Sequence, residues 1–163
     1  MILTNFKDFP KNGRLLGIDW GAKRTGLAVC DQEWNFVFPR EHIITKGQMD
    51  KRTNGHQSSG MSICPSVLLS IICDERIVGI VIGLPIRSDG SDSDTTRSVR
   101  AFAASLAAQT DLPIIFIDET LTSAEAEERQ KSNGKKKKES LDSVAAAVIL
   151  ENAIACIKRE NNE

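Results

Sequence analysis

Apolar residues occur in this chain as short runs, separated by polar turns and by longer segments with helical spacing. Five of the short runs predict strands, at residues 15–19, 26–30, 35–38, 77–83 and 114–117. The first two enclose the polar turn 21–25 and therefore predict a hairpin, and Pro39 is expected to end the third. The last two are continuous and rich in β-branched residues, which is typical of strands buried on both faces of a sheet.

Four segments predict helices, at residues 66–73, 95–109, 122–131 and 141–157. The first is apolar nearly all round, and the second has the i, i+3, i+4, i+7 spacing of an amphipathic helix. Thr122 and Glu125 have the spacing of a capping box at the start of the third helix, and Ser140 is the expected cap of the fourth. The polar stretches 46–60, 84–94 and 132–139 predict loops.

The order of these elements predicts an α/β fold. Three leading strands, followed by alternating helices and strands, favour a mixed sheet that is antiparallel at its start and parallel at its end. We therefore expect a mixed five-stranded sheet flanked by helices. The length of 163 residues predicts one domain over residues 1–163, with loose tails at 1–13 and 158–163.

The composition narrows the classes of function. The chain has 21 Lys and Arg against 22 Asp and Glu, a net charge of −1, so it does not hold nucleic acid by bulk positive charge, although local basic patches can. With no Tyr, six Phe and two Trp, an aromatic stacking platform for single strands is poorly supplied. No apolar run has the ~18–20 residues that span a bilayer, and the first residues lack a secretory signal. We expect a cytoplasmic protein with no membrane partner.

The four cysteines, Cys30, Cys64, Cys73 and Cys156, are scattered and form no Cys-x-x-Cys pair. Cys30, Cys73 and Cys156 have apolar neighbours and are interpreted as reduced core thiols, not as a disulfide framework or a zinc site. The two histidines lie in polar stretches without ligand-spaced partners. Catalysis is therefore expected to rest on carboxylates.

Three acidic residues stand at positions where chemistry is expected. Asp19 ends the first predicted strand, Glu119 follows the last, and Asp142 is the second residue of the final helix. Sites in parallel sheets form outside the carboxyl ends of the strands, so the three carboxylates can meet if the strands of Asp19 and Glu119 are neighbours. Converging carboxylates repel one another unless a cation neutralises them. Oxygen ligands suit Mg²⁺ or Mn²⁺, and a pair of such ions is a recognised arrangement for phosphodiester hydrolysis.

Each acid also has a purely structural interpretation. An acid in the first turn of a helix, such as Asp142, suits the helix dipole, and an acid after a strand, such as Glu119, is a common turn residue. Asp19 is the hardest to explain in this way, because it interrupts a buried apolar run without an obvious local partner.

Four ordered blocks of the chain resemble the YqgF (RuvX-like) family. They are residues 17–29 (GIDWGAKRTGLAV), 81–85 with Asp89-Gly90, 118–126 (DETLTSAEA) and 141–146 (LDSVAA). The family's members are described as nucleases of pre-16S ribosomal RNA, and also as Holliday-junction-resolvase-like. The resemblance implies a ribonuclease H-like fold, and it assigns Asp19, Glu119 and Asp142 to the family's acidic positions.

One departure concerns the contacts to phosphate. Thr120 stands where the family usually has Arg, so other basic residues would have to compensate. The residues predicted to bind nucleic acid are Lys23, Arg24, Gly83, Lys135, Lys136, Lys137 and Lys138. Gly83 would leave room for a phosphate or ribose, although it can also simply end a strand, and a run of lysines is usually a solvated loop.

The resemblance implies a metal-dependent nuclease, using Mg²⁺ or Mn²⁺ and two ions, that processes the 5′ end of pre-16S rRNA. One alternative is a Holliday junction resolvase acting on four-way DNA, and another is a catalytically silent RNA-binding or ribosome-assembly module. The opening motif also occurs in actin-like and Hsp70-like ATPases, but those proteins need two such domains. Whether the protein is a monomer or a homodimer stays open.

Overall fold

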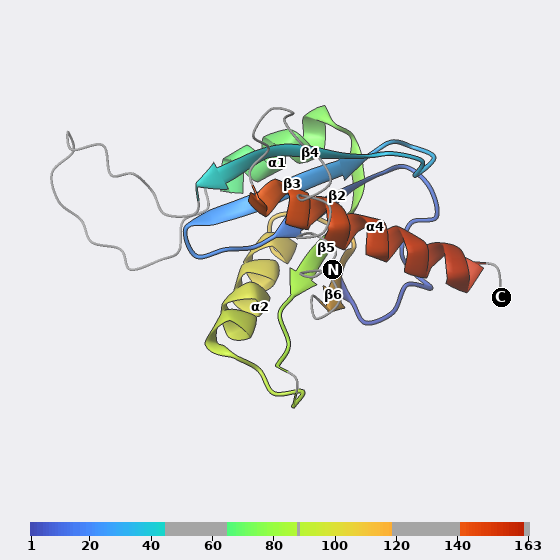
Figure 1. Ribbon diagram of the computed structural model, residues 1–163. Coiled ribbons are helices and arrows are strands. Elements are labelled where there is room, and N and C mark those ends of the chain that lie inside the picture. Colours follow the sequence, from blue (N-terminus) through green and yellow to red (C-terminus); the bar gives the residue numbers. More distant parts are fainter. Residues whose placement is uncertain (45–64, 88, 119–140, 162–163) are drawn as a thin grey trace, which may run out of the picture.

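The computed structural model describes residues 1–44, 65–87, 89–118 and 141–161, and its centre is a six-stranded sheet in the order β1-β6-β5-β2-β3-β4 (Figure 1). The strands are β1 (Ile2–Leu3), β2 (Arg14–Asp19), β3 (Arg24–Cys30), β4 (Val37–Ile44), β5 (Ile77–Leu84) and β6 (Ile114–Asp118). β1, β6, β5 and β2 run parallel to one another, whereas β3 and β4 continue the sheet in antiparallel fashion. The antiparallel start and parallel finish are as predicted.

Helices cover both faces of this sheet. In the described part of the chain they are α1 (Pro65–Asp74), α2 (Asp94–Ala107) and α4 (Leu141–Asn161). α1 and α2 pack on one face, where Leu68 and Val99 meet Leu16 and Ile18 of β2 in one core. α4 crosses the other face (Figure 1), and its apolar side chains form a second core with Leu15. The alternation of side chains along β2 thus supplies both cores.

Local sequence explains where these elements begin. Ser93 caps α2, and a reciprocal hydrogen bond between its backbone and the Thr96 hydroxyl completes a capping box. The Thr96 hydroxyl also donates to the Pro85 carbonyl, which ties the start of α2 to the end of β5.

No helix in the described ranges is both long enough and apolar enough to cross a membrane.

Most predicted elements are confirmed, including the four strands that correspond to β2, β3, β5 and β6 and the helices that correspond to α1, α2 and α4. The predicted helix 122–131 and the loops 46–60 and 132–139 lie outside the described residues. The sheet has six strands, not five, because Ile2 and Leu3 pair with Ile114 and Ile115.

Described parts of both predicted tails belong to regular elements. The N-terminal stretch carries β1, and the side chain of Phe9 is only 2% exposed because it packs in the core beneath α4. At the other end α4 continues to Asn161, and Lys158 donates a hydrogen bond of 3.1 Å to the Trp34 carbonyl. Strand pairing and burial of an aromatic ring hold the N-terminal stretch, and a tertiary hydrogen bond holds the end of α4.

Two further predictions are corrected. Pro39 does not end the third strand, since β4 continues to Ile44 with Pro39 opposite Ala28; β4 is an edge strand, where a missing N–H is tolerated. Cys73 is exposed and not a core thiol, because it lies on the outer side of α1. Cys30 is buried and Cys156 partly so, and all three are free thiols.

Candidate active site

The carboxyl ends of three parallel strands lie at one edge of the sheet. β2 ends at Asp19, β5 at Leu84 and β6 at Asp118. The strand that Asp19 ends, β2, and the strand that Glu119 follows in the sequence, β6, are not neighbours, because β5 lies between them. Ile18 pairs with Ile82 and Gly83 pairs with Ile117, so the register brings Gly83 beside Asp19. A residue without a side chain thus stands between the ends of β2 and β6.

Asp19 lies on the face of the sheet that α4 covers. Ile18 belongs to the core under α1 and α2, and successive residues of a strand point to opposite faces. Gly17, two residues earlier, faces α4, since a Cβ on Gly17 would lie 2.8 Å from both the Ala146 carbonyl oxygen and Leu150 Cβ. Asp19 continues this α4-facing row at the point where the strand reaches the sheet edge.

The first turn of α4 reaches the same place through Gly26. In the antiparallel pair β2/β3, Asp19 is the partner of Gly26, and such partners have Cα atoms about 4.5–5.5 Å apart. A Cβ on Gly26 would lie 1.9 Å from the main-chain carbonyl oxygen of Asp142. The structure therefore brings Asp19 and Asp142, which are remote in the sequence, to adjacent positions on one face.

A third contact holds the same turn of the helix. The Ser143 hydroxyl donates a hydrogen bond to the main-chain carbonyl of Arg40 in β4, and Ser143 is one of few buried polar residues among those described. Sequence analysis did not single out Ser143. The only signal was its place directly after Asp142, within the block at residues 141–146.

Basic side chains lie near these acids. Lys23, in the turn that joins β2 to β3, and Arg24, the first residue of β3, are both exposed. Because this turn follows Asp19 directly, both cations belong to the edge where the strands end. They can lower the electrostatic cost of bringing a polyanion to a pair of carboxylates.

Other predicted site residues are not brought together by the described structure. Glu119, Thr120 and the four lysines Lys135, Lys136, Lys137 and Lys138 lie outside the described residues. Asp118 does not replace Glu119, because it pairs with Leu84, and Leu84 faces the core under α1 and α2. Asp118 therefore lies on the opposite face of the sheet from Asp19.

The chemistry of the donors fits a hard divalent cation. Asp19 and Asp142 offer carboxylate oxygens, the ligands that Mg²⁺ and Mn²⁺ prefer. Within the described ranges, no group of three or more His, Cys, Asp and Glu side chains is arranged to hold a metal ion. A complete set of three acids would need Glu119.

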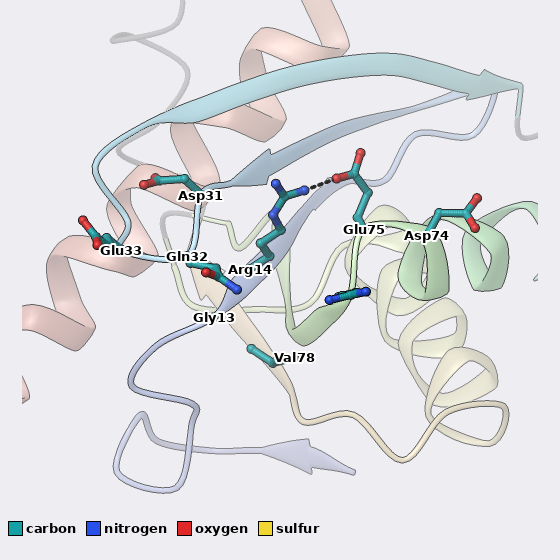
Figure 2. Close-up of a pocket in the computed structure, with 9 residues that line it drawn as sticks. Gly13, Arg14, Asp31, Gln32, Glu33, Asp74, Glu75 and Val78 are labelled. Atoms are coloured by element: carbon teal, nitrogen blue, oxygen red, sulfur yellow. Dashed lines mark hydrogen bonds and ion pairs between the residues drawn. The ribbon is translucent and has the colours of Figure 1, made fainter.

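A cavity of about 720 Å³ lies at the other end of the strands (Figure 2). Arg14 at the start of β2 points across it to Glu75, and Arg40 pairs with the same carboxylate. Asp31 and Glu33 line it from the turn between β3 and β4. Among the residues that the structure describes, no predicted site residue lines this cavity. Its side chains already satisfy one another in part, so we do not assign the active site to it.

Comparison with known proteins gives consistent results. The sequence model of the RuvX family, described as Holliday junction resolvase, matches residues 13–155. A protein of Maridesulfovibrio salexigens named "Putative pre-16S rRNA nuclease" is 43% identical over 145 residues, which cover 87% of this chain and 98% of that protein. A protein of the same name from Sphingopyxis alaskensis is 37% identical over 166 residues, covering 98% of this chain and 100% of the relative.

Solved structures extend the likeness to the fold. The RuvC protein of T. thermophilus in complex with a Holliday junction substrate aligns with a TM-score of 0.57 and 13% identity, over 91% of this chain and 96% of that one. A yeast mitochondrial Holliday junction resolvase aligns with a TM-score of 0.51 and 16% identity, over 96% and 85% of the two chains. These likenesses confirm the predicted ribonuclease H-like fold.

Proposed function

The chain belongs to the RuvX family, described as Holliday junction resolvase, and from that premise we propose that it is a metal-dependent nuclease that hydrolyses phosphodiester bonds in the 5′ region of pre-16S rRNA. The observation that carries the proposal is the contact between Gly26 and the first turn of α4, which sets Asp142 beside Asp19. The names of the relatives from Maridesulfovibrio and Sphingopyxis support RNA as the substrate. A cytoplasmic location goes with that substrate.

We assign the divalent-ion ligands to Asp19, Asp142 and Glu119. Asp19 is the central ligand in this proposal. It ends β2, which lies between β6, the strand that Glu119 follows in the sequence, and β3, the strand against which the first turn of α4 packs. One or two Mg²⁺ or Mn²⁺ ions, when bound, would activate a water molecule and stabilise the oxygen that leaves phosphorus. The protein's own part is to hold the carboxylates at a fixed separation on a sheet and a helix that are packed together.

The remaining residues act on the substrate's phosphates. Lys23 and Arg24 are exposed beside Asp19 and would neutralise phosphates on either side of the cut. Gly83 would leave space for a phosphate or ribose between the ends of β2 and β6. Lys135, Lys136, Lys137 and Lys138 precede Asp142 in the sequence, and we propose that they add further phosphate contacts. These contacts would release counterions, so binding should weaken as salt rises.

The decisive experiment is cleavage of a 5′-extended 16S precursor by the wild type and by Asp19→Asn, with Mg²⁺, with Mn²⁺ and with EDTA. We expect metal-dependent cleavage that Asp19→Asn abolishes while the variant still folds, since the amide keeps the shape of the side chain and removes its charge. Asp74→Asn is the matched control. It makes the same chemical change at an exposed residue beside the cavity at the other end of the strands, and it should cleave like the wild type.

A four-way DNA junction in the same assay tests the second candidate, a junction resolvase. That candidate is favoured by the family's description and by the likeness to a RuvC protein in complex with a Holliday junction substrate. Cleavage of the junction without cleavage of the precursor would replace the RNA substrate with DNA. Binding of the precursor with cleavage of neither the precursor nor the junction, with either ion, would refute the nuclease and leave the silent RNA-binding module.

A further inference from the structure

The first turn of α4 is held against the sheet at two points. On β3, Gly26 lies so close that a Cβ there would be 1.9 Å from the Asp142 carbonyl oxygen and 3.0 Å from the Ser143 nitrogen. On β4, the Arg40 carbonyl accepts the hydrogen bond from the Ser143 hydroxyl. Ser143 is 2% exposed and follows Asp142 directly, so both points act on the turn that carries a proposed metal ligand.

These two contacts constrain the turn in different ways. The contact at Gly26 is one of close packing, which limits how near α4 comes to the sheet but has little directional preference. The hydrogen bond is directional, since its strength falls steeply when donor and acceptor are misaligned. It therefore fixes the turn laterally, along the line from β3 towards β4. Without it, Asp142 can move sideways with respect to Asp19 while the packing at Gly26 is kept.

We propose that Ser143 is a positioning residue of the divalent-ion site, whose hydroxyl holds Asp142 at the separation from Asp19 that ion binding needs. This inference rests on the proposed function. The anchor is a main-chain atom of Arg40, whereas the side chain of Arg40 pairs with Glu75 at the end of α1. The role therefore belongs to the Ser143 hydroxyl and to the path of β4, and not to the Arg40 charge.

The test measures Mn²⁺ binding to the RNA-free protein by electron paramagnetic resonance, beside kcat and KM on the precursor. Ser143→Ala is expected to bind Mn²⁺ on the order of tenfold more weakly, the lower end of the loss seen when partners that orient metal ligands are removed. The KM for RNA should stay at the wild-type value, because the Ser143 side chain is buried and is not offered to a substrate. Ser143→Thr keeps the hydroxyl and should regain most of the Mn²⁺ affinity.

Two controls separate this role from general effects of the substitutions. Ser98 in α2 donates its hydroxyl to the Asp94 carbonyl at 3.0 Å, so Ser98→Ala makes the same substitution and removes a hydroxyl hydrogen bond within another helix. This variant should leave Mn²⁺ affinity unchanged. Arg40→Ala removes the ion pair but keeps the carbonyl, and it should also bind Mn²⁺ like the wild type. Thermal unfolding of each variant fixes the temperature at which the folded proteins are compared.

The outcomes distinguish this inference from the proposed function. If Asp142→Asn weakens Mn²⁺ binding while folded Ser143→Ala binds like the wild type, the positioning role is wrong and the ion site stands. A Ser143→Thr variant as weak as Ser143→Ala would also overturn the role, because the hydroxyl would then not be what matters. If neither Asp19→Asn nor Asp142→Asn weakens Mn²⁺ binding, the ion site itself is wrong, and the positioning role fails with it.

Discussion

Replacing Gly26 with Ala tests the contact that sets Asp142 beside Asp19. The added Cβ would lie 1.9 Å from the Asp142 carbonyl oxygen, whereas ordinary contact begins at 3.4 Å. The first turn of α4 must therefore retreat by about 1.5 Å, the difference between these two distances. The obstacle is backbone and cannot turn aside as a flexible side chain would.

This retreat has an energetic and a catalytic consequence. Overpacking costs about 1–3 kcal/mol, and loss of the glycine's freedom in the unfolded chain offsets roughly 0.4–1 kcal/mol of it. A net loss of about 1 kcal/mol lowers the unfolding temperature by roughly 2–4 °C in a domain of this size. Displacement of a catalytic group by about 1 Å can lower the rate on the order of 100-fold, so cleavage should fall far more than stability does.

The matched comparison is Gly17→Ala, which presses on α4 further along the helix. Its Cβ would lie 2.8 Å from the Ala146 carbonyl oxygen, so it needs a shift of only about 0.6 Å to reach the same 3.4 Å. Thermal unfolding and precursor cleavage are measured for both variants below their unfolding temperatures. Gly17→Ala should lose less thermal stability and less cleavage activity than Gly26→Ala. If Gly26→Ala unfolds at the wild-type temperature and cleaves the precursor at the wild-type rate, the close approach of α4 to β3 is refuted.

Three further predictions concern other parts of the molecule. Backbone N–H groups of Phe36 and Asn35 hold the pKa of Asp31 below its usual 3.8. The ionised form therefore contributes stability above about pH 4, and this stability is lost as the pH falls through the lowered pKa. The difference in unfolding free energy between the wild type and Asp31→Asn should shrink from pH 6 to pH 2.5 in urea titrations. Trp34→Phe removes a partly buried hydrogen bond of 2.6 Å to the Gly13 carbonyl and should cost about 1–2 kcal/mol, seen as a lower urea midpoint with an unchanged slope. Replacing Lys23 and Arg24 together with Ala should reduce the slope of log affinity for RNA against log salt by about 1–2, and an unchanged slope would remove them from the phosphate contacts.

The edge of the sheet that carries the candidate site was predictable because its signals are local. An acid that ends an apolar run, as Asp19 does, can be read from one strand. The order of the strands could not be read in this way, since β5 separates β2, which Asp19 ends, from β6, which Glu119 follows. The contacts of Gly26 and Ser143 with other elements could not be predicted in this way. They depend on where α4 crosses β3 and β4, which no periodicity within a single segment encodes.

The errors have the same origin. Pro39 is a strand breaker by local rules and is tolerated because β4 has a neighbour on one side only. The tail at 1–13 is polar on average, yet a single ring, that of Phe9, finds a place beneath α4 and orders the segment. In both cases the tertiary setting overrides a weak local preference.

The course of α4 also bears on how the protein is made. Residues 141–161 leave the ribosome after every strand of the sheet, yet they supply nearly half of the buried residues of one core and one of the two acids that the structure brings together. Until they emerge, the sheet exposes the apolar face that Leu15, Val81 and Ile115 form. Chaperones bind surfaces of this kind in nascent chains. On the proposed function, a chain that lacks α4 is expected to cut no substrate and to leave this face uncovered, because Asp142 lies in the first turn of that helix. The order of synthesis would then act as a safeguard, because the nuclease site is completed only after the sheet has been made.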